Sequence, residues 1–157
     1  MYQKILVAVD GSATSLRGLE EAIKVAKGTG GQLLLVHVVN EAIMVPDYVP
    51  SAYYEPLFAA LRQSGVKVLE QSAATVQRAA LRCERKLVET VGGRVADEVV
   101  RQANAWSADL IVMGTHGRRG LKRLALGSDA ELVLRLSCVP VLLVRDQPEG
   151  TSKESVS

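Results

Sequence analysis

Aromatic residues are scarce in this chain. Its 157 residues include four Tyr, one Trp and one Phe, so aromatic types make up 4% of the sequence. Hydrophobic types still reach 48%, which is enough for a core of ordinary size, and that core must be aliphatic. The length fits one domain rather than two. We expect residues 1–146 to form this domain and the polar segment 147–157 to be a disordered tail.

Cysteine is also rare. Cys83 and Cys138 lie far apart in the sequence, with no CxxC pair and no cluster of His and Cys. This pattern excludes the usual zinc-site spacings. We expect both cysteines to be buried as small hydrophobic side chains.

Strong charge of either sign and long apolar runs are missing. The chain carries 19 Lys and Arg against 17 Asp and Glu, a formal net charge of +2, which gives no general attraction to nucleic acids or acidic membranes. Residues 1–4 lead directly into an apolar run that Asp10 interrupts, so no signal peptide is expected. No apolar run approaches the roughly 18 residues of a membrane span. We expect a soluble, cytoplasmic protein with no nucleic-acid and no membrane partner.

Four apolar runs stand out, and none shows polar alternation. They cover residues 5–9, 33–39, 110–113 and 141–144. Runs of this kind are typical of strands covered on both faces of a parallel sheet. The segment 81–89 instead mixes apolar residues with several charges, which predicts an exposed edge strand.

Apolar residues recur at helical spacing between these strands. The pattern predicts helices over residues 12–28, 57–80 and 94–106, and a fourth that starts at Ser128. Ser12 is a plausible N-cap, Gly28 lies near the first helix's end, and Gly65 should weaken the second helix by about 1 kcal/mol relative to Ala. Strands alternating with helices indicate an α/β protein with an open parallel sheet and helices on both faces. Ligands of such sheets bind outside the carboxyl ends of the strands.

The segment after the third apolar run is rich in glycine. Gly114, Gly117, Gly120 and Gly127 allow main-chain N–H groups to converge, and Gly127-Ser128 opens a helix whose positive end attracts anions. An anion site is the natural interpretation. The alternative is a loop that only turns the chain, with Ser128 as an ordinary N-cap. Neighbouring cations at 118, 119, 122 and 123 suit phosphate contact by one or two of them better than nucleic-acid binding.

Common enzyme signatures are absent from the sequence. No GxxxxGK[ST] motif occurs, and no GxGxxG motif follows a strand. GxSxG and HExxH are also missing. These absences argue against four classes of enzyme: P-loop NTPases, dinucleotide-binding dehydrogenases, α/β-hydrolases and zinc proteases.

Several motifs fall at the ends of the expected strands. They are Asp10-Gly11-Ser12, His37-Val38, Asp-Leu-Ile-Val-Met-Gly-Thr-His-Gly-Arg over 109–118, the spacing Gly114-x2-Gly117-x9-Gly127-Ser128, and Cys-Val-Pro-Val-Leu-Leu-Val-Arg over 138–145. Together they closely resemble the universal stress protein family over roughly residues 3–145. In that family the Gly-x2-Gly-x9-Gly-Ser spacing marks the ATP-binding branch. The resemblance implies the adenine nucleotide alpha-hydrolase-like fold, strand order 3-2-1-4-5, a homodimer, and ATP with Mg²⁺ as cofactor.

The resemblance also implies a set of nucleotide-binding residues. Main chain at Ala8 and Val38 would border the adenine, and Asp10 would lie near the ribose and a phosphate-bound Mg²⁺. Met113 and Gly114 would flank the ribose. The phosphate region would consist of Gly117, Arg118, Gly127, Ser128 and Asp129.

Two residues depart from the pattern of the family. Ala8 stands where many nucleotide-binding members have proline. Asp129 stands where a small apolar residue is usual, and its carboxylate competes with phosphate for the positive helix end. Mg²⁺ or the arginines at 118 and 119 would offset this repulsion.

Other polar residues admit structural interpretations. Asp10 also suits a simple turn before Gly11. His37 lies inside an apolar run, and we interpret it as a hydrogen-bonded core residue rather than a ligand. His116 lies in the Gly-rich loop, where phosphate contact and plain exposure are both open.

Two segments suggest interaction surfaces. Val141, Leu142, Leu143 and Val144 form an edge strand that is apolar on both faces, so pairing with the same strand of a second copy is expected. The long, proline-containing loop over residues 40–56 is expected to act as a lid or a partner surface.

The sequence thus favours an ATP-binding regulatory module of a stress response that acts on a protein partner. The first alternative is a slow ATPase or a phosphoryl- or adenylyl-transfer enzyme. For catalysis only Asp10 and His116 offer themselves as a general base, and no P-loop lysine is present, so no catalytic residue is assigned. The second alternative is a nucleotide-free oligomeric stress factor.

Overall fold

The computed structural model describes residues 1–41, 48–116 and 126–146. The helices and strands alternate along the chain as the sequence predicts. In chain order they are β1 (Lys4–Ala8), α1 (Ala13–Thr29), β2 (Gln32–Asn40), the short 3-10 helix η2 (Ser51–Tyr53), α2 (Tyr54–Arg78), β3 (Cys83–Thr90), α3 (Val95–Trp106), β4 (Leu110–Gly114), α4 (Ser128–Leu136) and β5 (Val141–Val144). The predicted tail, 147–157, lies outside the described residues.

The five strands form one parallel sheet in the order β3-β2-β1-β4-β5, which confirms the expected order. β1 pairs with β2 on one side and with β4 on the other, so it occupies the middle of the sheet. β3 and β5 are the edges. The charged residues of β3 are therefore on an exposed edge strand, as their pattern predicts.

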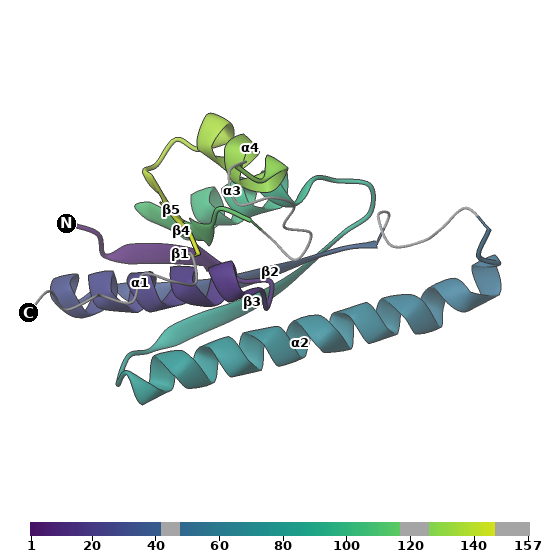
Figure 1. The fold of residues 1–157 in the computed structure, drawn as a ribbon, viewed down its shortest axis with the longest axis horizontal. Coiled ribbons are helices and arrows are strands. Elements are labelled where there is room, and N and C mark those ends of the chain that lie inside the picture. Colours follow the sequence, from purple (N-terminus) through teal and green to yellow (C-terminus); the bar gives the residue numbers. More distant parts are fainter. Residues whose placement is uncertain (42–47, 117–125, 147–157) are drawn as a thin grey trace, which may run out of the picture.

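Helices cover both faces of the sheet (Figure 1). α1 and α2 lie on one face and α3 and α4 on the other. Alternate residues of β1 divide accordingly: Ile5 and Val7 join the core beneath α1 and α2, whereas Leu6 joins the core beneath α3 and α4. The fully buried large side chains are all Ile, Leu or Val, so the aliphatic core is confirmed.

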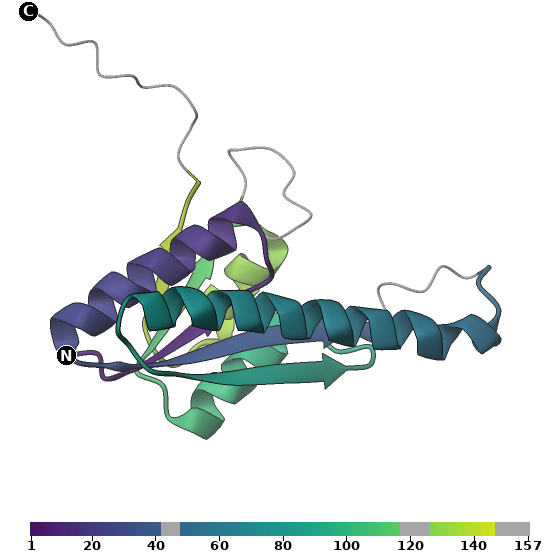
Figure 2. The same ribbon diagram turned by 90° about the horizontal axis from the view of Figure 1, so that it is seen from below.

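The end of α1 and the start of α2 differ from the sequence prediction. α1 continues through Gly28 and ends where Gly30 adopts a left-handed conformation with φ of 71°. α2 begins at Tyr54 rather than at residue 57, because a proline in the first helical turn needs no N–H partner and Pro56 is tolerated there. Figure 2 shows that the N-terminal part of α2 extends beyond the ends of β2 and β3.

The cysteines do not match their expected burial. Cys138 is exposed and Cys83 is half-buried, so the prediction that both lie in the core is wrong. Cys138 follows the end of α4 in a short connection to β5, outside the two cores. Cys83 begins the edge strand β3, and burial raises the pKa of its thiol.

Gly65 is needed where α2 crosses the sheet. A Cβ atom at this position would lie 2.7 Å from Cδ2 of His37 and 2.7 Å from Cδ1 of Leu87. Such distances are too short for carbon atoms in contact. The low helix propensity of glycine is therefore offset by close packing of α2 against β2 and β3.

Gly65→Ala should consequently destabilise the fold, although alanine is the better helix former. We expect the free energy of unfolding to fall by about 1–3 kcal/mol because the added methyl group overpacks the contact. Gly28→Ala is the matched control, since a Cβ atom at that position would meet nothing within 4 Å. It should stabilise the protein by up to about 1 kcal/mol. Urea unfolding measures both, and equal stabilisation by the two variants would contradict the packing role of Gly65.

Candidate functional site

A tight, hydrogen-bonded turn follows β1. Val9 N–H donates to the Val36 carbonyl oxygen at 2.9 Å, and Asp10 N–H donates to Oγ of Ser15 at 3.0 Å. Ser12 N–H donates to Oδ1 of Asp10 at 2.8 Å, and Gly11 between them has a φ of 82°. The carboxylate of Asp10 therefore stabilises the turn, as its structural interpretation predicts.

The predicted N-cap of α1 is confirmed within the same turn. Ser12 Oγ accepts a hydrogen bond from Ser15 N–H at 3.2 Å. These bonds hold the half-buried Asp10 at the carboxyl end of the central strand.

The end of β4 lies against the first turn of α1. Gly114 is buried, and a Cβ atom there would lie 2.9 Å from atoms of Thr14. The Thr14 hydroxyl donates to the carbonyl oxygen of His116, two residues beyond Gly114. Thr115 N–H donates to the Val144 carbonyl oxygen of β5 at 2.9 Å. The chain after β4 is thus fixed to α1 and to β5 before it reaches the Gly-rich segment.

The start of α4 is joined to the same place. Gly127 N–H donates to the Thr115 carbonyl oxygen at 2.8 Å, and a Cβ atom at Gly127 would lie 2.9 Å from that oxygen. The first helical bond of α4 runs from Glu131 N–H to the Gly127 carbonyl oxygen, so the N–H groups of Ser128, Asp129 and Ala130 precede it. α4 starts at Ser128 as predicted. Its N-cap is Gly127, so the interpretation of Ser128 as an N-cap is wrong.

Most of the predicted site residues lie at the carboxyl ends of the strands. Asp10, Gly114, Gly127 and Ser128 lie where β1 and β4 end and α4 begins. The half-buried Ala8 and Val38 and the buried Met113 all pack with the core on the side of α3 and α4. Gly117 and Arg118 lie outside the described residues, and so does part of the 40–56 loop, residues 42–47.

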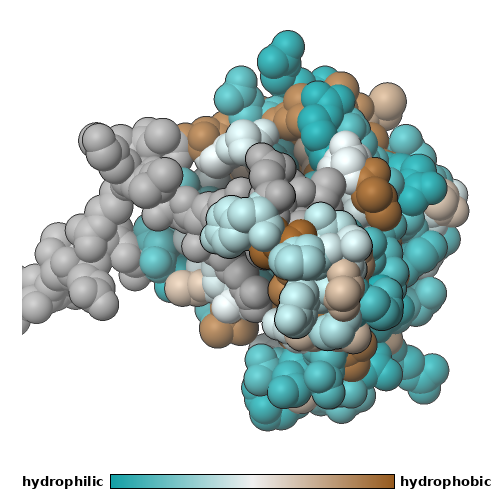
Figure 3. All heavy atoms as spheres, turned by 90° about the vertical axis from the view of Figure 1, so that its right-hand side faces the viewer, coloured by the Kyte–Doolittle hydropathy of each residue, from teal (hydrophilic) through white to brown (hydrophobic). Residues whose placement is uncertain are grey.

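Figure 3 views the molecule from the end toward which the strands run. Near the middle of this face hydrophobic residues lie beside weakly polar ones, and strongly hydrophilic residues lie to the right of them and below them. A mixed surface of this kind suits a ligand with both an apolar ring and polar groups.

The first turn of α4 carries negative charge. Asp129 and Glu131 are both exposed within it. Their carboxylates reduce the attraction that a helix N-terminus normally exerts on an anion. The start of α4 thus combines main-chain N–H groups that precede the first helical bond with two exposed carboxylates.

His116 is half-buried rather than exposed. Its Nδ1 lies 3.0 Å from the hydroxyl oxygen of Thr115, which is buried. Across residues 1–41, 48–116 and 126–146, no three His, Cys, Asp or Glu side chains gather as a metal site.

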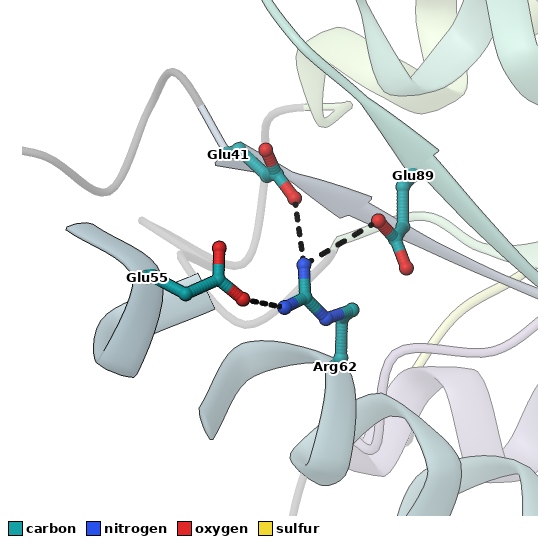
Figure 4. Close-up of polar contacts among 4 residues, drawn as sticks. All are labelled: Glu41, Glu55, Arg62 and Glu89. Atoms are coloured by element: carbon teal, nitrogen blue, oxygen red, sulfur yellow. Dashed lines mark hydrogen bonds and ion pairs between the residues drawn. The ribbon is translucent and has the colours of Figure 1, made fainter. Parts of the chain in front are cut away.

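A charged cluster that sequence reasoning missed lies at the carboxyl ends of β2 and β3 (Figure 4). Arg62 of α2 contacts Oε1 of Glu55 at 2.5 Å, Oε1 of Glu41 at 3.4 Å and Oε2 of Glu89 at 3.6 Å. The hydrogen bond with Glu55, followed by the charges of the three carboxylates, raises the pKa of Arg62. Glu41 is only 8% exposed, so its carboxylate depends on this cation.

The cluster holds the first half of α2 against the ends of two strands. Only the spacing of Glu55 and Arg62, two helical turns apart, was visible in the sequence. The approach of Glu41 and Glu89 depends on the pairing of β2 with β3.

The fold and the site define a class of protein. The sheet is open and parallel, with β1 between β2 and β4, and helices cover both of its faces. The chain is therefore a doubly wound α/β protein, a class whose ligands bind outside the carboxyl ends of the strands. In the part of the chain that the structure describes, no helix has the length and apolar character needed to cross a membrane.

Comparison with known proteins identifies the family. The profile of the universal stress protein family matches residues 1–145. Universal stress protein YxiE of Bacillus subtilis (strain 168) is 32% identical over 151 residues, which cover 92% of this chain and 100% of the relative. The chain therefore belongs to the universal stress protein family.

Solved structures agree with this assignment. A universal stress protein from Burkholderia pseudomallei is 36% identical and superposes with a TM-score of 0.72, covering 91% of this chain and 96% of that one. A universal stress protein solved in complex with cAMP is 25% identical, with a TM-score of 0.66 and coverage of 91% and 97%.

Replacing Arg62 should expose how strongly the charged cluster supports α2. Arg62→Met is expected to lower the unfolding midpoint, because it leaves the buried Glu41 carboxylate without its cation. Arg94→Met is the matched control, since within residues 1–41, 48–116 and 126–146 Arg94 pairs with Asp97 alone, one turn away at the exposed start of α3. Its effect should be much smaller. Thermal unfolding followed by circular dichroism measures both, and equal midpoints for the two variants would contradict the role given to the cluster.

Proposed function

We propose that this universal stress protein binds an adenine nucleotide at the carboxyl edge of its sheet and acts as a nucleotide-dependent regulatory module. The observation that carries the proposal is the convergence of three chain segments. The turn after β1, the end of β4 and the start of α4 are joined by the bonds from Thr14 to His116 and from Gly127 to Thr115. The start of α4 carries the N–H groups of Ser128, Asp129 and Ala130, which precede its first helical bond, and N–H groups at a helix N-terminus favour a phosphate.

The proposed nucleotide would lie across this edge with its base toward the sheet. Ala8 and Val38 would border the adenine, and Met113 and Gly114 would flank the ribose. Asp10 would accept hydrogen bonds from the ribose. The phosphates would meet Gly117, Arg118, Gly127, Ser128 and Asp129. The cAMP complex of a related protein supports an adenine ligand.

ATP with Mg²⁺ is the form that we favour. No side chain fits at Gly127, because a Cβ atom there would lie too close to the Thr115 carbonyl oxygen. Main chain would therefore border the phosphates at this position. Main-chain N–H groups are the donors that phosphates accept from. Mg²⁺ would neutralise phosphate charge, which the exposed carboxylates of Asp129 and Glu131 otherwise oppose. The phosphates would bind the Mg²⁺, and the Asp10 carboxylate would lie near this ion. Occupancy of the site would then change a surface that a regulatory protein partner recognises.

Calorimetric titration with ATP, with and without Mg²⁺, tests the proposed site. Gly127→Ala should weaken binding about tenfold or more, because its methyl group displaces the start of α4 from Thr115. Ser128→Ala should weaken binding by about fivefold if its hydroxyl donates to phosphate.

Asp129→Asn is the control of opposite sign. Removing its charge should raise affinity for ATP, most strongly when Mg²⁺ is absent. The site assignment is wrong if Gly127→Ala and Ser128→Ala both bind as tightly as the parent protein while remaining folded.

We also propose that β5 joins two copies into a homodimer. β5 is a sheet edge, and its register with β4 directs the main-chain N–H groups of Val141 and Leu143 away from β4. Exposed leucines lie on both sides of this edge: Leu142 is 36% exposed, and Leu134 of α4 is 50% exposed. Antiparallel pairing of β5 with its copy about a two-fold axis would cover the strand edge and these side chains.

Leu142→Lys should favour the monomer, because it places two like charges near the proposed two-fold axis. We expect the dissociation constant of the dimer to rise by at least about tenfold. Leu16→Lys is the control, since this leucine of α1 is also exposed but lines a pocket on the side of α1 that faces α2. Light scattering at several concentrations measures the oligomeric state. A parent protein that stays monomeric at tens of micromolar would contradict the proposal.

A further inference from the structure

His37 contacts the main chain at the point where β1 ends. Its Nδ1 lies 2.7 Å from the carbonyl oxygen of Val9, the residue before Asp10. A carbonyl oxygen only accepts hydrogen bonds, so Nδ1 of His37 must carry the proton and donate. The imidazole thus bonds across from β2 to the chain that leads into the candidate site.

With this bond, both polar groups of one peptide are hydrogen-bonded to side chains. The peptide between Val9 and Asp10 has two polar groups, the Val9 carbonyl and the Asp10 N–H. His37 donates to the first, and the Ser15 hydroxyl accepts from the second at 3.0 Å. Because both groups are held by side chains from different elements, the plane of this peptide is fixed relative to β2 and α1. The direction in which the Asp10 side chain leaves the main chain is fixed with it.

The imidazole itself has little room to move. It lies under α2, where a Cβ atom at Gly65 would be 2.7 Å from Cδ2 and 3.2 Å from Nε2 of His37. On the sheet, His37 is in register with Leu87 of β3. The ring is therefore held between a helix backbone and a neighbouring strand, and it can direct its donor only within narrow limits.

His37 acts from the face of the sheet opposite the proposed ligand. Successive side chains of a strand point to opposite faces. Val38 packs with the core beneath α3 and α4, whereas His37 lies beneath α2. The imidazole therefore does not need to touch the nucleotide to influence the site.

We propose that His37 is a positioning residue for the nucleotide site: its Nδ1–H, held in place by Gly65, fixes the Val9–Asp10 peptide and so aims the Asp10 carboxylate. This inference rests on the proposed function. It assigns a task to a half-buried histidine whose hydrogen bond to the main chain would otherwise have only a structural role.

Two variants of nearly equal shape separate the donor from the bulk of the side chain. His37→Asn keeps a donor on the branch that corresponds to Nδ1, whereas His37→Leu has the same branching and no donor. Two readouts are needed. The first is the exchange rate of the Asp10 and Ser12 amide hydrogens in the nucleotide-free protein. The second is the affinity for ATP with Mg²⁺, with thermal unfolding as a check on the fold.

We expect His37→Leu to accelerate exchange at Asp10 and Ser12 about fivefold to tenfold, while exchange at Val7 in the middle of β1 stays within about twofold. ATP affinity should fall by a similar factor. His37→Asn should stay within about threefold of the parent in both readouts. If His37→Leu does not fold, parent-like exchange in His37→Asn supports the proposal and accelerated exchange contradicts it.

The outcomes separate the two proposals. If the parent protein binds no adenine nucleotide, the proposed function fails, and amide exchange alone decides whether His37 positions Asp10. Unchanged exchange and affinity in His37→Leu would overturn the positioning role. Equal losses in His37→Leu and His37→Asn would also overturn it, because the loss would then follow the ring and not the donor.

Discussion

The close approach of α1 to β4 is the contact on which the arrangement of the site depends. Gly114 has no side chain, so the first turn of α1 lies directly against the end of β4 at Thr14. One turn later, Gly18 lies near the main chain of Met113. At this separation the Thr14 hydroxyl reaches the His116 carbonyl oxygen. Any side chain at Gly114 would push α1 outward and break the link between the turn after β1 and the segment after β4.

The site combines rigid main-chain geometry with an unfavourable charge. Hydrogen bonds fix the main chain at the turn after β1, the end of β4 and the start of α4, and a main chain that is already fixed loses little entropy when a ligand binds. The carboxylates of Asp129 and Glu131 oppose an anion at the same place. At the proposed nucleotide site, a ligand that carries its own cation would therefore bind better than a bare phosphate.

Sequence reasoning predicted the sheet well because its signals are local. Uninterrupted aliphatic runs such as residues 33–39 mark strands buried on both faces, and the charges of 81–89 mark an edge. The helix ends were less predictable. Gly28 and Gly30 are alike in sequence, and only the path of the chain decides which one adopts the left-handed conformation. Cys138 was misplaced because composition does not reveal that its connection lies outside both cores.

The site was predictable where residues follow strands and unpredictable where contacts cross elements. Asp10 and Gly114 follow the paired strands β1 and β4, and Gly127 is bonded to Thr115 just after β4. The bond from His37 to Val9 depends on the pairing of β1 with β2. The close packing of Gly65 against the His37 ring depends on how α2 crosses β2 and β3. Neither has a signature in the sequence. Arg62 was missed for the same reason.

Mapping of amide chemical shifts during titration with ATP and Mg²⁺ tests the central claim most directly, because it reports where on the molecule a nucleotide sits. The account predicts that the largest shifts fall on amides of residues 10–12, 114–116 and 127–130, and that amides of the charged edge strand β3 hardly change. Large shifts confined to other surfaces, or none at millimolar nucleotide, would contradict it.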